Sequence, residues 1–182
     1  MIELTRLTED DLELMMEWRM RPEIDAMMFN TVHLTIEGQK AWFAKIKDSD
    51  TQIRWVVRNN GTPIGSLYFT DIDRKNQRCE SGWFVADKTG LQLTDIMALQ
   101  QNSYDYAFDV LGLNRIYGYV MDTNKGLLRL LACCGIIKEG TLSEHVIKDG
   151  VKHDVYVIGL TKTKWDQLKA EKKVSYPKFV IE

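Results

Sequence analysis

The sequence predicts a single domain of the mixed α/β class, in which a mostly antiparallel sheet carries helices on both faces. Runs of alternating apolar and polar residues, typical of half-buried strands, are interleaved with segments whose apolar residues recur at helical spacing. The length of 182 residues suits one core rather than two. The composition, 45% hydrophobic and 27% charged, is that of a globular protein, which excludes the disordered and fibrous classes.

The first third of the chain predicts one strand followed by helices. Residues 2–7 alternate in hydropathy, as a short strand does. Thr8 suits the N-cap of a helix, because the three acidic residues after it favour the positive end of the helix dipole. The pair Arg21-Pro22 ends that helix and begins a short second turn, since the residue before a proline disfavours helical geometry. Thr35 caps the next helix, which ends in the polar loop 47–50.

Three strands are expected to follow as an antiparallel meander. Residues 53–58 and 64–70 are rich in β-branched and aromatic side chains. Between them, Asn59-Asn60-Gly61 supplies residues that tolerate the positive φ angles of a tight hairpin. After a polar turn, residues 79–85 alternate again and predict the third strand.

The second half predicts three helices and three strands, followed by an extended tail. In chain order we expect a helix over 93–111, a strand over 115–120, a helix over 124–134, two strands between 136 and 160 that turn at Asp149-Gly150, and a helix over 164–173. Gly112 and Gly135 follow the first two of these helices, as C-cap glycines do. The tail, residues 174–182, is partly apolar, so we expect it to dock. We divide the chain into a domain over 1–162 and a helix with tail over 163–182.

Charge and composition exclude several classes of partner. The 24 Lys+Arg and 26 Asp+Glu residues leave a net charge of −2, so no overall basic field attracts nucleic acid or an anionic membrane. No apolar run approaches the roughly 20 residues of a membrane helix, and the N-terminus lacks the regions of a signal peptide, which predicts a cytoplasmic protein. The cysteines Cys79, Cys133 and Cys134 form no metal or disulfide spacing and are expected to be reduced, buried thiols.

The element order and several motifs resemble the GNAT superfamily of acyl-CoA-dependent N-acetyltransferases over nearly the whole chain. Trp18-Arg19 with Arg21-Pro22-Glu23-Ile24 is similar to a segment of the nucleotide-sugar acetyltransferases of the pseudaminic acid type. The end of the family's central helix and the strand after it are similar to Tyr106-Ala107-Phe108 with 111–116. The C-terminal half shared with ribosomal-protein N-terminal acetyltransferases is similar to a set of residues here, namely Asp122, Asn124-Lys125, Gly135, Glu139-Gly140, His145, Asp149-Gly150 and Asp154. Together they predict the GNAT fold.

The resemblance implies acetyl-CoA as cofactor, held where the fourth and fifth strands splay apart. In the family its pyrophosphate rests on backbone N–H groups at the start of the central helix, within the pattern [QR]-x-x-G-x-[GA]. Counting places this pattern on residues 91–96, where none of the required residues stands and the loop is degenerate. The candidate cofactor-binding residues there are Leu93, Thr94, Asp95 and Ile96. Asp95 would place a carboxylate at a site that binds the negatively charged pyrophosphate. Alternatively, a local insertion would make residues 90–93 the pyrophosphate-binding loop.

The resemblance also implies roles for three other positions. Glu80 is the candidate catalytic base, although a glutamate paired on a strand face would fit the same pattern. Backbone N–H groups near Phe84 or Val85 would stabilise the oxyanion. Asn124 matches a family asparagine that orients the cofactor, and it also suits a helix N-cap. The tyrosine that often protonates the thiolate in this family falls on Leu131 here.

Three residues near the first helix are candidates for the acceptor pocket. Trp18, Arg19 and Arg21 could bind substrate, with the arginines holding a phosphate, or could pack and pair at a helix end. The cluster of nearby methionines, Met15, Met16, Met20, Met27 and Met28, favours a plastic core. The three histidines show no metal-ligand spacing, so we expect no metal site.

The sequence is therefore compatible with two functions. The first is a GNAT-family N-acetyltransferase that transfers acetyl from acetyl-CoA to an amine, either on a nucleotide-linked sugar or at a protein N-terminus. The second is a catalytically inactive GNAT-fold subunit of a larger assembly, for example a phage particle. The missing glycines and the apolar tail, which would contact a protein partner, favour the second.

Overall fold

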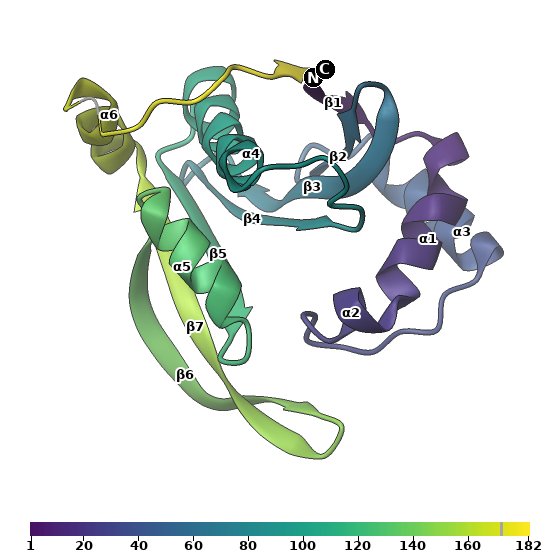
Figure 1. The fold of residues 1–182 in the computed structure, drawn as a ribbon. Helices are drawn as coiled ribbons and strands as arrows, with labels where there is room; N and C mark the ends of the chain where they lie inside the picture. Colours follow the sequence, from purple (N-terminus) through teal and green to yellow (C-terminus); the bar gives the residue numbers. More distant parts are fainter. Residues whose placement is uncertain (172) are drawn as a thin grey trace.

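Eight strands form one sheet in the order β6-β7-β5-β4-β3-β2-β1-β8 in the computed structural model, which describes residues 1–171 and 173–182 (Figure 1). The strands are β1 (Ile2–Arg6), β2 (Ile53–Asn59), β3 (Thr62–Asp73), β4 (Arg78–Val85), β5 (Arg115–Met121), β6 (Ile137–Lys148), β7 (Val151–Thr161) and β8 (Val180–Ile181). Neighbouring strands are antiparallel except for the pairs β4–β5 and β1–β8, which are parallel.

Helices cover both faces of this sheet (Figure 1). They are the 3₁₀ turn η1 (Glu9–Asp11), α1 (Leu12–Met20), α2 (Pro22–Asp25), α3 (Ile36–Ile46), α4 (Leu93–Asp105), the π-helical segment η2 (Tyr106–Val110), α5 (Lys125–Cys133) and α6 (Lys162–Ala170). A small apolar cluster around Leu12 and Val56 joins α1 and α3 to one face. The main core joins α4, α5 and α6 to the other through Leu99, Leu131 and Trp165. The predicted fold class is confirmed.

Most elements lie within a few residues of their expected positions, and two differ at their ends. The central helix ends at Asp105, because the N–H of Leu111 bonds to the carbonyl of Tyr106, 2.9 Å away, and this five-residue spacing makes its last turn π-helical. The last helix begins at Lys162, where Thr161 accepts a hydrogen bond from the N–H of Lys164, and it ends at Ala170. The expected extension to 173 includes position 172, which lies outside the described residues.

The C-terminal tail docks on the same core as the rest of the chain. Asn102 of α4 donates to the carbonyl of Pro177 and accepts from the N–H of Phe179, at 2.9 and 3.0 Å. Beyond these contacts β8 adds a parallel strand beside β1, and the indole of Trp55 donates to the backbone carbonyl of Glu182. The core is contacted by four apolar residues of the tail, Val174, Tyr176, Phe179 and Ile181, and by fully buried Trp165 of α6, whereas Val180 is exposed.

Two of the three cysteines are buried as predicted, and the third is exposed. Cys79 and Cys134 are buried, and burial raises the pKa of each thiol to about 12. Cys133 is exposed, contrary to the prediction, because it lies on the outer side of the amphipathic helix α5. Among the described residues, no helix is both long and apolar enough to pass through a membrane.

Candidate active site

The parallel strands β4 and β5 pair over only three residues and then diverge (Figure 1). The last pair joins Glu80 to Tyr117, and each strand then continues for several residues without the other. A cavity of about 900 Å³ opens in this wedge. It falls within the size range of small-molecule sites, roughly 300–1,000 Å³. The wedge is therefore the candidate active site.

The alternation of β4 divides the cavity into two halves. Phe84 packs edge-on against Trp18 of α1, with ring centroids 6.3 Å apart. Its neighbour Trp83 points to the other face, where its indole donates a hydrogen bond to Gln100 of α4. Because side chains alternate along a strand, Glu80 shares the α1 side with Phe84. We call the α1 side the acceptor half and the side of α4 and α5 the donor half.

Glu80 is a half-buried carboxyl on the wall of the acceptor half. Burial raises its pKa above the ordinary value, and the nearby negative charge of Asp71 raises it further. Such a group can accept a proton from a neighbouring amine at neutral pH. Phenol rings surround it, because Tyr117 is its strand partner and Tyr119 contacts Tyr117 edge-on.

Tyr68 of β3 adds a third phenol to the acceptor half. It is the strand partner of Gly82, where an added Cβ would lie 2.3 Å from the phenol oxygen, so only glycine leaves room for this ring. Burial raises the pKa of Tyr68, which keeps its proton in place. The guanidinium of Arg54 stacks on its other side, 4.7 Å from the ring centroid.

Of the three residues predicted to bind the acceptor, only Arg19 lines the cavity. Its guanidinium donates to the Asp25 carboxylate at 3.0 Å and to the carbonyl of Asn30 at 2.6 Å. Trp18 is 3% exposed and belongs to the core beside Phe84. Arg21 donates to the carbonyl of Ala86, 3.4 Å away. The structure thus gives all three residues the packing and pairing contacts that the sequence allowed as the alternative.

The donor half contains the first turn of α4. Leu93 and Ile96 line the cavity, whereas Thr94 and Asp95 do not. The Asp95 carboxylate turns back and accepts a hydrogen bond from the N–H of Gln92 at 2.8 Å. Gly90 lies two residues before this N-cap with a positive φ of 73°, so the chain turns ahead of the helix.

The residues of the donor half fit a diphosphate in spite of the missing glycines. Among the described residues, the N–H groups of Leu93 and Thr94 have no hydrogen-bond acceptor, and they lie at the positive end of the α4 dipole. Lys88, in the loop before α4, lines the same cavity and supplies a positive charge. Asp95 remains the one carboxylate in this turn of the helix.

The other residues predicted to bind the cofactor lie at the wedge. Phe84, Val85 and Asn124 line the cavity. The Asn124 side chain accepts a hydrogen bond from the N–H of Leu127, so it is the N-cap of α5 as well as part of the wall. Leu131, at the position of the family tyrosine, is buried and contributes only apolar surface.

Several wall residues were not found from the sequence. Tyr68, Tyr117 and Lys88 carried no motif, and only the pairing of distant strands and the turn before α4 bring them to the cavity. The methionine cluster is only partly core, because Met20 and Met27 are exposed and Met27 and Met28 line the acceptor half. The loop after α2 carries them to the cavity wall, which periodicity along one helix could not indicate.

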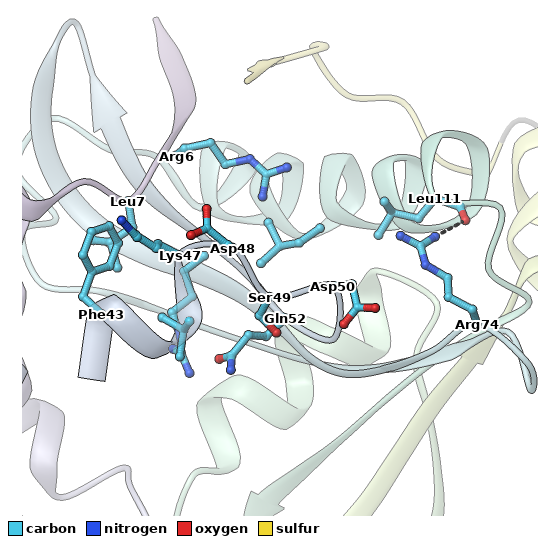
Figure 2. Close-up of a pocket in the computed structure, with 13 residues that line it drawn as sticks. Arg6, Leu7, Phe43, Lys47, Asp48, Ser49, Asp50, Gln52, Arg74 and Leu111 are labelled. Carbon is cyan, nitrogen blue, oxygen red and sulfur yellow. Dashed lines mark hydrogen bonds between the residues drawn. The ribbon is translucent and has the colours of Figure 1, made fainter. Parts of the chain in front are cut away.

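A second cavity, of about 460 Å³, lies at the start of β2 and contains none of the predicted site residues (Figure 2). Basic and acidic side chains from separate elements line it, among them Arg6, Arg74, Asp48 and Asp50. Arg74 donates to the carbonyl of Leu111 at 3.0 Å. This cavity is distinct from the wedge, which alone contains the candidate base.

A family model described as an acetyltransferase (GNAT) domain matches residues 2–137, so the chain belongs to the GNAT acetyltransferase family. This confirms the resemblance drawn from the motifs. Acetyl-CoA, the cofactor that the resemblance implies, is the acetyl donor of that family.

Two curated relatives and one solved structure illustrate the likeness. An uncharacterized N-acetyltransferase, p20 of Bacillus licheniformis, is 25% identical over 167 residues, which cover 89% of this chain and 93% of the relative. Acetyltransferase PseH of Campylobacter jejuni is 28% identical over 126 residues, covering 69% and 76%. A spermidine N-acetyltransferase from Vibrio cholerae, crystallised with CoA and spermine, has the same fold with a TM-score of 0.84 at 22% identity, covering 90% of this chain and 97% of that one.

Proposed function

We propose that the chain is an acetyl-CoA-dependent N-acetyltransferase whose acceptor is a small, positively charged amine. The observation that carries the proposal is the place of Glu80, a half-buried carboxyl at the last residue pair before β4 and β5 diverge. Its raised pKa keeps it a competent proton acceptor in a pocket that is partly shielded from water. Membership of the GNAT family supports the same reaction.

In this proposal the chain's own groups carry out a balanced transfer. Glu80 first accepts one proton from the charged amine, directly or through a water molecule, and the neutral nitrogen then attacks the carbonyl carbon of the thioester. Backbone N–H groups near Phe84 and Val85 stabilise the charge that develops on the carbonyl oxygen. A C–N bond forms, the C–S bond breaks, and the second proton lost by the nitrogen passes to the departing sulfur, so that CoA leaves as a thiol and Glu80 returns its proton to solvent.

The charges of the acceptor half favour a cationic amine over a nucleotide-linked sugar. A phosphate would need a free guanidinium, but Arg19 is bound by Asp25 and Arg21 by a backbone carbonyl. The carboxyls of Glu23 and Glu80 line this half together with phenol rings, and such a wall attracts cations. The Vibrio cholerae enzyme, named for spermidine, offers a precedent within the fold.

A comparison of acceptors tests the proposal. Release of CoA from acetyl-CoA would be measured with spermidine, with a nucleotide-linked amino sugar and with a peptide carrying a free N-terminus. We expect kcat/KM for spermidine to exceed the others by about a hundredfold or more, since buried charges discriminate strongly. A preference for the nucleotide sugar would show that the acceptor class is wrong, and the absence of turnover with all three would contradict the enzymatic proposal.

A further inference from the structure

A buried lysine joins two parts of the acceptor half that are far apart in sequence. The ammonium of Lys148, at the end of β6, donates to the backbone carbonyls of Asp25 and Met28 and to the Asp25 carboxylate; the last two contacts are 2.9 and 3.0 Å long. The Lys148 side chain is only 9% exposed. All three acceptors belong to residues 25–31, which we call the α2 loop.

The shape of the β6–β7 hairpin brings Lys148 to this loop. A register shift between Leu142 and Val146 marks a bulge, in which Glu144 has a positive φ of 49° and its N–H donates to Asp154 at 2.8 Å. Bulges bend a strand and increase its twist. In Figure 1 the hairpin extends well beyond the other strands, and its tip curves toward the side of α1 and α2. The contact is therefore built into the hairpin rather than made by a flexible surface side chain.

Asp25 is the centre of the contact network. Its carboxylate accepts hydrogen bonds from the hydroxyl of Thr31 at 2.7 Å and from Arg19 and Lys148 at 3.0 Å each. Arg19 also donates to the carbonyl of Asn30. The two cations thus hold the loop backbone at three carbonyls, those of Asp25, Met28 and Asn30, and neutralise the Asp25 carboxylate.

The same loop forms a wall of the acceptor half. Met27, Met28, Phe29 and Asn30 all line the wedge cavity. Residues 26–28 of the loop donate backbone hydrogen bonds to α2, and side chains hold the backbone beyond them. Loss of the Lys148 ammonium would leave the carbonyl of Met28 without its donor, the carbonyl of Asp25 with only the N–H of Met28, and the Asp25 carboxylate with a single cation.

We propose that Lys148 is a positioning residue that fixes the α2 loop as the wall against which the acceptor amine binds. The tip of the β6–β7 hairpin and the α2 loop then act as a latch, and closure of the latch sets the affinity for the acceptor. The role toward the acceptor rests on the proposed function, whereas the latch itself is a property of the fold. The donor half lies on the other side of β4, so its affinity for acetyl-CoA does not depend on the latch.

The test compares Lys148→Met with Lys152→Met. Met keeps most of the length of the side chain and removes the charge. Lys152 lies on the same hairpin, is exposed and forms an ion pair with Glu144. Hydrogen exchange of the unliganded proteins would be followed in peptides that cover the α2 loop. We expect exchange about tenfold faster in Lys148→Met and unchanged in Lys152→Met. With spermidine as the acceptor, the KM for the amine should rise about tenfold, while kcat and the KM for acetyl-CoA stay within about twofold.

Each result has a defined meaning. Unchanged exchange of the α2 loop in a folded Lys148→Met protein overturns the latch, and so does an equal rise of both KM values. If Lys148→Met does not fold, Asp25→Asn removes the charge at the centre of the network while keeping its shape, and the same two readouts apply. If the wild-type chain acetylates no amine, the proposed function fails, and the exchange experiment decides on the latch alone.

Discussion

The raised pKa of Glu80 implies that its ionised form costs the folded protein stability at neutral pH. Its folded pKa is raised, first by burial and then by Asp71. A carboxyl with a raised pKa stabilises the fold in its protonated form, below the unfolded pKa of about 4.5, and this contribution is lost as the pH rises through the folded pKa. At pH 7 the ionised group is therefore unfavourable, as functional residues often are.

The first prediction concerns Glu80→Gln. The substitution keeps the shape and removes the charge, so the midpoint of thermal unfolding at pH 7 should stay the same or rise. Without the base, kcat should fall by about 10²–10⁴. Calorimetry and steady-state assays with spermidine measure the two effects. A protein that loses stability and keeps its kcat would identify Glu80 as a structural residue.

The neighbouring carboxylate provides a second prediction. Asp71→Asn removes one of the two causes that raise the pKa of Glu80, and asparagine tolerates the left-handed φ of 49° at this position. The acid limb of the profile of kcat/KM against pH should therefore move to lower pH. Asp73→Asn is the matched control, because Asp73 lies two residues away and is bound by Asn76 and Arg78. An acid limb that stays in place would exclude Glu80 as the base.

A third prediction tests whether Asp95 opposes the donor. Asn at this position can still accept the hydrogen bond from the N–H of Gln92, but it carries no charge to repel a diphosphate. Acetyl-CoA should bind Asp95→Asn up to about tenfold more tightly than wild type, since like charges about 4 Å apart repel by roughly 1–4 kcal/mol. Titration calorimetry measures the change, with Asp10→Asn at an exposed, distant site as the control. Equal affinities would show that the diphosphate does not lie at this turn.

For the helices and strands, the sequence predicted the features that depend on neighbouring residues and missed those that depend on contacts between distant strands. Caps such as Thr35 and Asn124 are local, because their side chains bond to N–H groups three residues later, and both were found. The divergence of β4 and β5 came only from the family resemblance, since nothing in residues 81–85 indicates where pairing stops. The π-helical end of α4 and the pairing of β8 with β1 likewise depend on contacts with distant residues.

The docking of the C-terminal tail on α4 leads to a prediction about stability. Asn102 is buried on α4 and bonds to the tail backbone at both Pro177 and Phe179. Asn102→Ala would remove the partner of the partly buried Pro177 carbonyl and Phe179 N–H, so it should lower the free energy of unfolding by about 1–3 kcal/mol. Urea unfolding measures this, with Asn114→Ala at an exposed position as the control. Equal stability of the two variants would show that the tail does not depend on this contact.

For the whole molecule, the docked tail and the wedge bear on the two functions that the sequence left open. Most apolar side chains of the tail pack against the chain's own core, which weakens the argument for a partner-binding segment. The wedge keeps an open cavity of about 900 Å³, whose wall includes a candidate base, a lysine and the N–H of Leu93, which has no acceptor among the described residues. An inactive structural subunit would have no reason to retain such a space, because filling it would add to stability.

Binding of acetyl-CoA by the intact chain is the final prediction, and it separates the two functions without any assumption about the acceptor. A donor that binds only the folded state stabilises it by about 2.7 kcal/mol at 100 times its dissociation constant. Unfolding would be followed by calorimetry with increasing acetyl-CoA, and with acetate at the same concentrations as the control. We expect the midpoint to rise steadily with acetyl-CoA alone. A midpoint that does not move at millimolar acetyl-CoA would favour the inactive subunit, because every proposed step of the transfer begins with the donor seated in the wedge.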